Sequence, residues 1–230
     1  MRRRSPPVNG GATDGELHSL INIYVARHGE TTWNVEGRIQ GQSDSGLSPK
    51  GYAQSLALLE QLKDQPISAI YTSTLQRSIL TAHPISEYLR LPIQKQRELD
   101  EIAFGILEGV QLSTIDGALK IEWGRFKENR LAYHIPGAEN YTDVTNRIRP
   151  FVEKILQNHK GEEILIVGHR VANQMLIRVL MDYPSEKVLK IQQSNDCLYL
   201  IKRNGETKVF HYINGEAGEG FLFESQMKII

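Results

Sequence analysis

The sequence has a single cysteine, Cys197, among 230 residues. One thiol excludes an internal disulfide framework and a cysteine-based metal site, and it is typical of a protein in a reducing cytosol. No apolar run approaches the length that spans a membrane, and none follows the N-terminal arginines as a secretory signal would require. The sequence therefore predicts a cytoplasmic protein that has no membrane partner.

The chain also lacks an excess of either charge, since 27 basic and 27 acidic side chains balance. It therefore has no overall attraction for nucleic acid or for anionic lipid, and neither is an expected partner. Residues 1–19 lack apolar periodicity and are predicted to form a mobile tail with solvated arginines. The composition, 40% hydrophobic and 23% charged, is that of an ordinary globular protein, and residues 20–230 are predicted to form a single domain.

An apolar, β-prone run from Ile23 to Ala26 stops abruptly at Arg27, His28 and Gly29. Hydroxyl residues suited to starting a helix follow directly. Backbone N–H groups at a helix start attract phosphate, a guanidinium offers a planar fork of donors, and glycine allows a ligand to approach the backbone closely. An isolated Arg-His pair is more often a surface pair or a satisfied core histidine. This context nevertheless makes His28 a candidate nucleophile at a phosphate site.

Two further predicted strands end in polar residues. A strand over Ile67–Thr72 is followed by Ser73, a natural helix cap, and by Arg77 in or near the first helical turn. A buried strand over Ile164–Val167 is followed by His169 and a helix. The carboxyl ends of parallel strands meet at one edge of a sheet, where α/β proteins bind ligands. The alternation predicts a three-layer α/β/α sandwich on a mostly parallel sheet.

The run from Leu99 to Gly109 combines acids with apolar residues and glycines. A carboxylate among apolar neighbours can have its pKa raised by desolvation, as a general acid requires. On composition alone the run could equally be an acidic loop or a helix cap. Glu101 is the candidate acid, and Glu108 is predicted to be structural.

The run Arg-His-Gly-Glu-Thr at residues 27–31, followed by Trp33 and Asn34, resembles the signature of the histidine phosphatase superfamily, also called the phosphoglycerate mutase-like family. Later stretches resemble the family's second arginine block, its acid block and its second histidine block: residues 73–82, 99–109 and 168–169. The resemblance extends from about residue 23 to about residue 213. It implies a phosphoglycerate mutase-like fold, no metal or other cofactor, transient phosphorylation of His28 and proton donation by Glu101.

The resemblance also concerns the residues around the phosphate. The glycine-rich loop 37–47 is similar to the family's loop whose glutamine, here Gln40, often lies near the phosphate. Arg170 stands where the family usually has a small residue, so it changes either the shape of the pocket floor or the charge near the substrate. Glu139, in a turn similar to the family's Pro-Gly-Gly-Glu-Ser turn, is expected only to support neighbouring residues.

The remaining elements are predicted from capping and periodicity. They comprise a helix over residues 48–63 that starts at Ser48 and Pro49, short helices beside the site over 111–135, a long helix over 142–159 that contains Pro150, and a helix over 171–181 before the C-terminal strands. A hairpin with an Asn204–Gly205 turn is predicted over residues 197–213, and residues 215–230 are predicted to be a weakly determined end.

The predicted reaction is a two-step phosphoryl transfer that hydrolyses a small phosphate ester, such as a sugar phosphate or a phosphoglycerate. The predicted catalytic residues are His28, Glu101, Arg27, Arg77 and His169, and the predicted phosphate-binding residues are Arg27, Asn34, Gln40, Gly41, Arg77, His169 and Arg170. The sequence contains no His-Glu-x-x-His pair and no Gly-x-x-x-x-Gly-Lys loop, so it does not indicate a metal protease or a nucleotide hydrolase.

Two alternatives stay open: a cofactor-dependent phosphoglycerate mutase and a protein that binds a phospholigand without chemistry. The mutases of the family carry a longer, basic insertion between the acid block and the Pro-Gly turn. Here the segment from Glu101 to Pro136 is short and of mixed charge, which favours the phosphatase branch. The oligomeric state is open.

Overall fold

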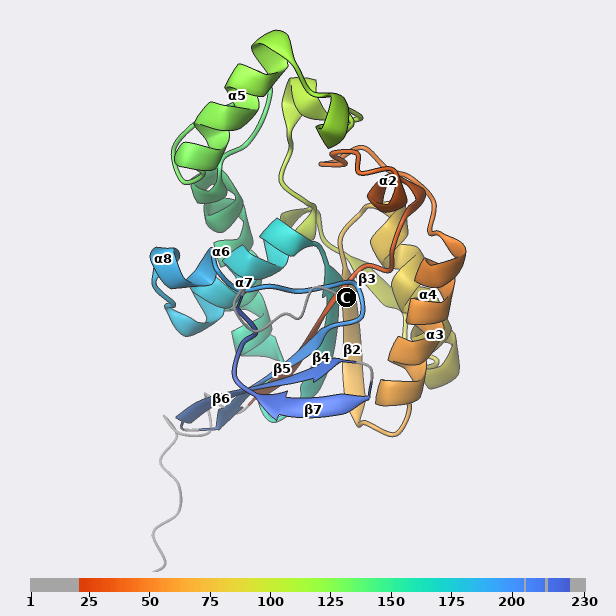
Figure 1. Cartoon of the computed structure of the whole chain (residues 1–230). Helices are drawn as coiled ribbons and strands as arrows, with labels where there is room; N and C mark the ends of the chain where they lie inside the picture. The colour runs from red at the N-terminus through yellow and green to blue at the C-terminus, as the bar shows by residue number, and fades with distance from the viewer. Residues whose placement is uncertain (1–20, 205, 214, 224–230) are drawn as a thin grey trace, which may run out of the picture.

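The computed structural model describes residues 21–204, 206–213 and 215–223, and the predicted tail at residues 1–19 lies outside them. Its centre is a sheet with the strand order β3-β2-β4-β1-β5-β6-β7 (Figure 1). The strands are β1 (Ile21–Arg27), β2 (Ile67–Thr72), β3 (Ile93–Lys95), β4 (Glu163–Gly168), β5 (Leu198–Asn204), β6 (Glu206–Ile213) and β7 (Glu216–Glu219).

Helices cover both faces of this sheet, with α3 and α4 on one side and α6 and α7 on the other (Figure 1). The helices are α2 (Thr32–Val35), α3 (Pro49–Leu62), α4 (Gln76–Leu89), α5 (Gly117–Glu128), α6 (Tyr141–Asn158), α7 (Arg170–Met181) and α8 (Ser185–Val188), and short 3₁₀ turns span Arg97–Leu99, Gly105–Leu107 and Leu112–Thr114. The predicted three-layer sandwich is confirmed.

Alternation along the central strands explains the two cores. In β1, Ile23 and Val25 pack in the core on the α6 and α7 side, whereas Tyr24 and Ala26 pack in the core on the α3 and α4 side. In β4, even-numbered residues 164 and 166 join the first core and odd-numbered residues 165 and 167 join the second. A strand buried on both faces must be apolar throughout, as these two are.

The half of the sheet that carries the sequence motifs is parallel, as predicted, because β3, β2, β4 and β1 pair in parallel. From β1 onward, β5, β6 and β7 continue the sheet in antiparallel pairings. The C-terminal hairpin is confirmed, although position 205 of its predicted turn lies outside the described residues. The prediction of a weakly determined end was wrong for residues 215–223. There β7 pairs with β6, and Phe221 is buried in the core on the α6 and α7 side.

Within the described part of the chain, no helix combines the length and the apolarity that crossing a lipid bilayer requires.

Two glycines allow the start of α3 to touch the turn after β1. A methyl group on Gly29 would lie 2.6 Å from the carbonyl oxygen of Gly51, and one on Gly51 would meet the carbonyl oxygen of Glu30. Backbone atoms cannot move aside for such a methyl group as the end of a flexible side chain can. The sequence predicted that a ligand approaches the backbone closely at Gly29. In the structure the start of α3 makes that close approach instead.

We expect Gly51→Ala to lower the free energy of unfolding by about 2 to 3 kcal/mol, because it overpacks a backbone contact. Urea denaturation measures this as a lower midpoint at an unchanged slope. The matched control is Gly124→Ala in α5, where a methyl group would meet nothing within 4 Å. It should stabilise the helix by about 0.5 to 1 kcal/mol. Equal stability of Gly51→Ala and the wild type would contradict this account of the contact.

Candidate active site

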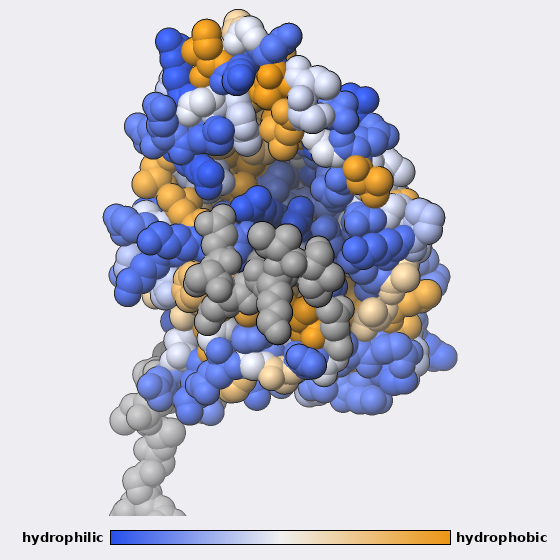
Figure 2. All heavy atoms as spheres, in the orientation of Figure 1, coloured by the Kyte–Doolittle hydropathy of each residue, from blue (hydrophilic) through white to orange (hydrophobic). Residues whose placement is uncertain are grey.

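The carboxyl ends of β1, β2 and β4 open into a cavity of about 240 Å³ beneath the α5 segment. Figure 2 shows a hollow in the surface there, with mainly hydrophilic residues around it. Most of the residues predicted from sequence line this cavity: Arg27, His28, Asn34, Gln40, Gly41, Arg77, Glu101 and Arg170. His169 is the exception, because its ring is fully buried behind the cavity wall.

His28 presents one ring nitrogen to the cavity side because its other nitrogen is already bonded. Nδ1 lies 2.8 Å from the carbonyl oxygen of Gly29, which can only accept, so Nδ1 carries the hydrogen and Nε2 keeps its lone pair. The side chain is 2% exposed. Burial, and then the charges of Arg27 and Arg77, hold the pKa of His28 well below its usual range. The imidazole is therefore neutral at neutral pH and can act as a nucleophile.

Arg27 is held at the end of β1 by one strong contact, in which Nη1 donates to the carbonyl oxygen of Gln193 at 3.0 Å. Its buried Nε has no acceptor among the described residues. Burial, followed by the charge of Arg170, lowers the pKa of Arg27 to about 10, so the guanidinium stays charged at neutral pH. A half-buried cation with an unused, buried donor is a strong position for an anion.

Arg77 is 1% exposed at the start of α4. Its Nη1 donates to the carbonyl oxygen of Ser43 at 2.8 Å and to Asp44 Oδ1 at 2.9 Å, and Nη2 donates to the carbonyl oxygen of Gly41 at 2.6 Å. The Nε atom is buried without an acceptor in the described part of the chain. Arg77 therefore organises the loop after α2 and keeps its Nε donor free, as the prediction of an anion-binding arginine requires.

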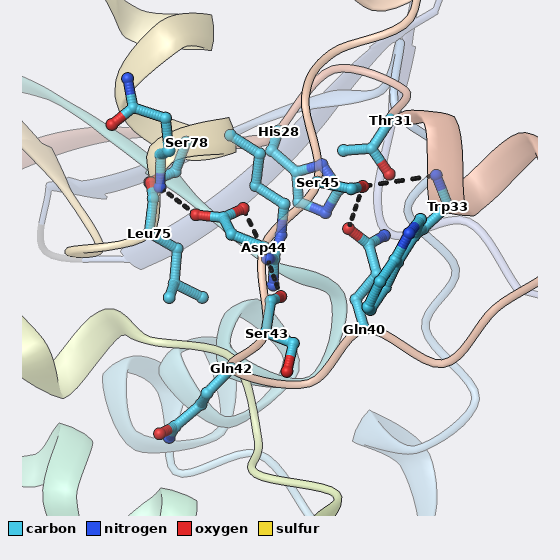
Figure 3. A network of polar contacts seen from close by, with 12 residues as sticks. His28, Thr31, Trp33, Gln40, Gln42, Ser43, Asp44, Ser45, Leu75 and Ser78 are labelled. Atoms are coloured by element: carbon cyan, nitrogen blue, oxygen red, sulfur yellow. Dashed lines mark hydrogen bonds and ion pairs between the residues drawn. The ribbon is translucent and has the colours of Figure 1, made fainter. Parts of the chain in front are cut away.

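The loop from Gln40 to Ser45 lies beside His28 in Figure 3. The Ser45 hydroxyl donates to Gln40 Oε1 at 3.3 Å and accepts from the Trp33 backbone N–H at 3.3 Å. Gln40 is thereby oriented through its oxygen, and its amide nitrogen has no partner among the described residues. Gly41 has a φ of +57°, a conformation that favours glycine, and a methyl group there would strike the Glu108 carboxylate.

The helix start after β1 does not offer N–H groups to a ligand, and that prediction was wrong. Each backbone N–H from Gly29 to Asn34 already has a protein acceptor, in chain order Thr81 Oγ1, Gln54 Oε1, Asn34 Oδ1, Gly46 O, Ser45 Oγ and Thr31 Oγ1. Thr31 and Asn34 form a reciprocal capping box that consumes two of these groups. Positive charge at this site therefore comes from the arginine side chains.

His169 lies directly behind His28, with the two ring centroids 5.1 Å apart. Its Nε2 is 2.7 Å from Ser73 Oγ, and its buried Nδ1 has no partner among the described residues. Burial, then the charge of Arg77, keeps the pKa of His169 well below its usual range. Ser73 was predicted to cap α4, but Leu75 occupies the cap position, and the Ser73 hydroxyl orients His169 instead.

Glu101 is 9% exposed and its two oxygens differ. Oε1 accepts from the backbone N–H groups of Ile102 at 3.0 Å and of Val171 and Ala172 at 3.2 Å, at the start of α7. Oε2 has a single long contact, at 3.4 Å, from Val171. Oε2 is therefore the oxygen that can carry and deliver a proton, while Oε1 fixes the carboxyl group in place.

The acid block is held by Arg147, a residue of α6 that the sequence did not single out. Its guanidinium donates to the carbonyl oxygens of Glu98 and Asp100 at 2.7 Å and forms a salt bridge with Glu139 at 2.7 Å. Glu139 also accepts from the Ala103 backbone N–H at 3.0 Å, so it takes the supporting place predicted for it. This bonding fixes the backbone from which Glu101 projects.

Glu108 is structural, as predicted. Its Oε1 accepts from the backbone N–H groups of Phe104 at 2.9 Å and Gln42 at 3.0 Å. Its Oε2 accepts from the Ser43 backbone N–H at 2.9 Å and from the Ser43 hydroxyl at 2.6 Å. Glu108 therefore ties the acid block to the loop after α2, and it does not line the cavity.

An aromatic wall closes the outer side of the cavity. It consists of four rings whose neighbouring centroids are 5.6 to 5.9 Å apart: Phe104, Trp123, Phe126 and Tyr141. Arg38 and Arg130 also line the cavity and had no role in the sequence prediction. Arginines on a loop and after a helix usually extend into solvent, so no local signal marked them.

No group of histidine, cysteine, aspartate and glutamate side chains that could hold a metal ion occurs among residues 21–204, 206–213 and 215–223.

Comparison with known proteins places this site in a family. Residues 23–215 match the model of the histidine phosphatase superfamily, branch 1. The chain is 28% identical over 162 residues to phosphoserine phosphatase 1 of Hydrogenobacter thermophilus, covering 70% of this chain and 77% of that protein. It is 32% identical over 167 residues to the "Probable phosphoglycerate mutase GpmB" of Salmonella choleraesuis, covering 72% and 77%.

A solved structure agrees with this placement. YhfR of Bacillus stearothermophilus superposes with a TM-score of 0.71 at 29% identity, covering 90% of this chain and 98% of that one. The match includes both histidine blocks, the second arginine block and the acid block, since all of them lie within residues 23–215. The chain belongs to the histidine phosphatase superfamily (branch 1).

Proposed function

We propose that the protein is a metal-independent phosphomonoester hydrolase that acts through a phosphohistidine on His28. The observation that carries the proposal is the state of His28: a buried, neutral imidazole with its Nε2 lone pair unused, beside two guanidiniums and across a cavity from the Glu101 carboxyl group. A nucleophile, an anion-binding pair and an acid that share one cavity are the parts that phosphoryl transfer requires.

In the first step His28 Nε2 attacks phosphorus, the bond from phosphorus to the ester oxygen breaks, and Glu101 gives its proton to the leaving oxygen. In the second step a water molecule attacks phosphorus, the phosphorus–nitrogen bond breaks and inorganic phosphate leaves. The proton of that water returns to Glu101, which restores the enzyme. The same carboxyl group thus serves as acid and then as base.

Charge supports this assignment. A phosphate monoester carries roughly −1.5 to −2 at neutral pH, and Arg27 and Arg77 each keep one buried Nε donor without an acceptor among the described residues. Gln40 and Asn34 line the same cavity and add neutral donors. His169, whose Nδ1 is unpartnered within the described ranges, stays a predicted phosphate contact.

The extent and location of the enzyme are also proposals. The family match over residues 23–215 supports one catalytic domain within residues 20–230. A cytoplasmic location is supported by Cys197, which is buried and unpaired, with a pKa that burial raises to about 12. Such a thiol is unreactive and suits a compartment where disulfides do not form.

The named relatives support small phosphorylated metabolites as substrates, because one is called a phosphoserine phosphatase and another a phosphoglycerate mutase. The test is a screen of phosphate esters with release of inorganic phosphate as the readout, repeated after exhaustive chelation. We expect release from several esters and the same rate after chelation. Loss of all activity on chelation, restored by a divalent cation, would contradict the metal-independent mechanism.

Phosphoglycerate mutase activity is the second candidate, and the similarity to GpmB favours it. A mutase must shield its phosphorylated intermediate from water, whereas a phosphatase must admit water. The segment 101–135 over this cavity contains one helix, α5, and otherwise only short 3₁₀ turns and loops. We therefore expect phosphate release without priming by bisphosphoglycerate. The comparison measures phosphate release and interconversion of the two monophosphoglycerates side by side. Rapid interconversion with negligible release would establish the mutase.

A further inference from the structure

The cavity contains more positive charge than one phosphoryl group needs. Five arginines line it, against one carboxylate, Glu101: Arg27, Arg38, Arg77, Arg130 and Arg170. Two of the five are paired within the protein, because Arg38 forms a salt bridge with Glu36 and Arg77 with Asp44. Arg27, Arg130 and Arg170 have no carboxylate partner among the described residues. The unpaired positive charge therefore exceeds what the catalytic step uses.

The two additional cations, Arg170 and Arg130, come from two separate segments that line the same cavity. Arg170 is exposed at the first position of α7, directly after His169, and lines the cavity beside Val171. Its charge acts on Arg27 at the inner end of the cavity and on Tyr141 in the aromatic wall. Arg170 is therefore within electrostatic reach of both Arg27 and the aromatic wall.

Arg130 approaches the same region from the segment after α5. Its carbonyl oxygen accepts the Tyr141 backbone N–H at 2.9 Å, which fixes the backbone next to the aromatic wall. Its charge, like that of Arg170, acts on the Tyr141 hydroxyl. Both guanidiniums and the Glu101 carboxylate act on the Tyr141 hydroxyl, so two positive charges and one negative charge share this part of the cavity. The leaving group, which takes its proton from Glu101, passes through this region.

We propose that Arg170 and Arg130 form a second anion-binding position that selects substrates whose leaving group carries its own acidic group, a carboxylate or a second phosphate. The inference rests on the proposed function, since it concerns the leaving group of that reaction. A guanidinium binds either oxyanion through a fork of two N–H groups. The aromatic wall limits the leaving group to a short chain or a single ring, because the whole cavity is about 240 Å³.

The test uses matched pairs of phosphate esters. 3-Phosphoglycerate and glycerol 3-phosphate differ in a carboxylate against a neutral hydroxymethyl group. Fructose 1,6-bisphosphate and fructose 6-phosphate differ in a second phosphate. The wild type should prefer the more acidic member of at least one pair by about tenfold or more in kcat/KM, and the preferred pair identifies the second anion. No preference in either pair would overturn the inference.

Substitution then tests whether Arg170 provides the preference for the acidic ester. Arg170→Gln should remove most of the preference, so that kcat/KM falls about tenfold more on the acidic ester than on its neutral partner, mainly through KM. Arg170→Lys keeps the charge without the fork and should recover part of the preference. The control is Arg149→Gln, an exposed arginine of α6 outside the cavity, which should change nothing. Equal losses on charged and neutral esters would overturn the assignment of Arg170.

Failure of the proposed function gives a different result. In that case the wild type releases no phosphate from any ester, p-nitrophenyl phosphate included. Calorimetric titration then tests for the second anion position. It measures the dissociation constants of the wild type for 3-phosphoglycerate, glycerol 3-phosphate and the two fructose phosphates. Tighter binding of an acidic member by about tenfold, lost in Arg170→Gln, supports the inference, and equal dissociation constants within both pairs overturn it.

Discussion

Replacing His28 by alanine is expected to reduce phosphate release by at least about 10⁴-fold, because the variant has no nucleophile and the phosphoenzyme cannot form. Brief incubation of the wild type with a labelled substrate should leave a phosphoryl group that is labile in acid and stable in base. The same incubation of His28→Ala should leave none. Phosphate release and phosphoryl labelling both depend on one atom, His28 Nε2. This atom is free because the ring bonds to the Gly29 carbonyl oxygen through Nδ1.

A second histidine tests whether the effect is specific. His83 lies on the surface of α4, where its side chain is 56% exposed and 3.5 Å from Glu87. His83→Ala should keep wild-type activity and wild-type labelling. A His28→Ala variant that stays fully active would end the phosphohistidine mechanism. Label retained by His28→Ala would move the nucleophile to another residue.

The sequence predicted the parts of the fold that depend on local pattern. The strand at Ile67–Thr72 has the predicted bounds, and the helix after Ser48 starts where the cap and the proline place it. β7 was missed because Glu-Ala-Gly-Glu has no β-branched residue and no apolar alternation. Its partner, β6, provides the pairing that the sequence of β7 does not encode.

His28 and Arg77 could be predicted because each lies just after a predicted strand, and Glu101 because residues 99–109 resemble the family's acid block. All three line one cavity. It could not be predicted where function depends on contacts between distant segments. Ser73 has the features of a helix cap, yet its hydroxyl bonds to His169, which is 96 residues away. Arg147 lies in an amphipathic helix, where an arginine is ordinarily solvated, yet it holds the carbonyl oxygens of the acid block.

The capping box shows how one motif can support two interpretations. Residues 31–34 are suited to starting a helix, and a helix start in isolation attracts phosphate. In the fold, Asn34 Oδ1, Ser45 Oγ and Gly46 O take those N–H groups. The segment for which an anion site was predicted therefore positions the loop around His28. Arginine side chains supply the anion-binding groups instead.

The second large effect is expected at Glu101, where glutamine keeps the shape and removes the proton. In Glu101→Gln the amide oxygen can still accept from the Ile102, Val171 and Ala172 N–H groups, so the side chain should stay in place. Only the atom at Oε2 changes, from one that can give a proton to one that cannot. General acid catalysis contributes about 10²- to 10⁴-fold, so alkyl phosphate esters should slow by that factor.

The leaving group separates a chemical role from a structural one. p-Nitrophenolate leaves without help from an acid, so p-nitrophenyl phosphate should lose far less activity in Glu101→Gln than an alkyl ester does. A mutation that only disturbed the backbone next to Arg147 would slow both substrates alike. Glu87→Gln, on the exposed face of α4, is the matched control and should slow neither. Equal losses on both esters in Glu101→Gln would give Glu101 a structural role, and Glu108, which lies seven residues further along the chain, would then be the acid to test.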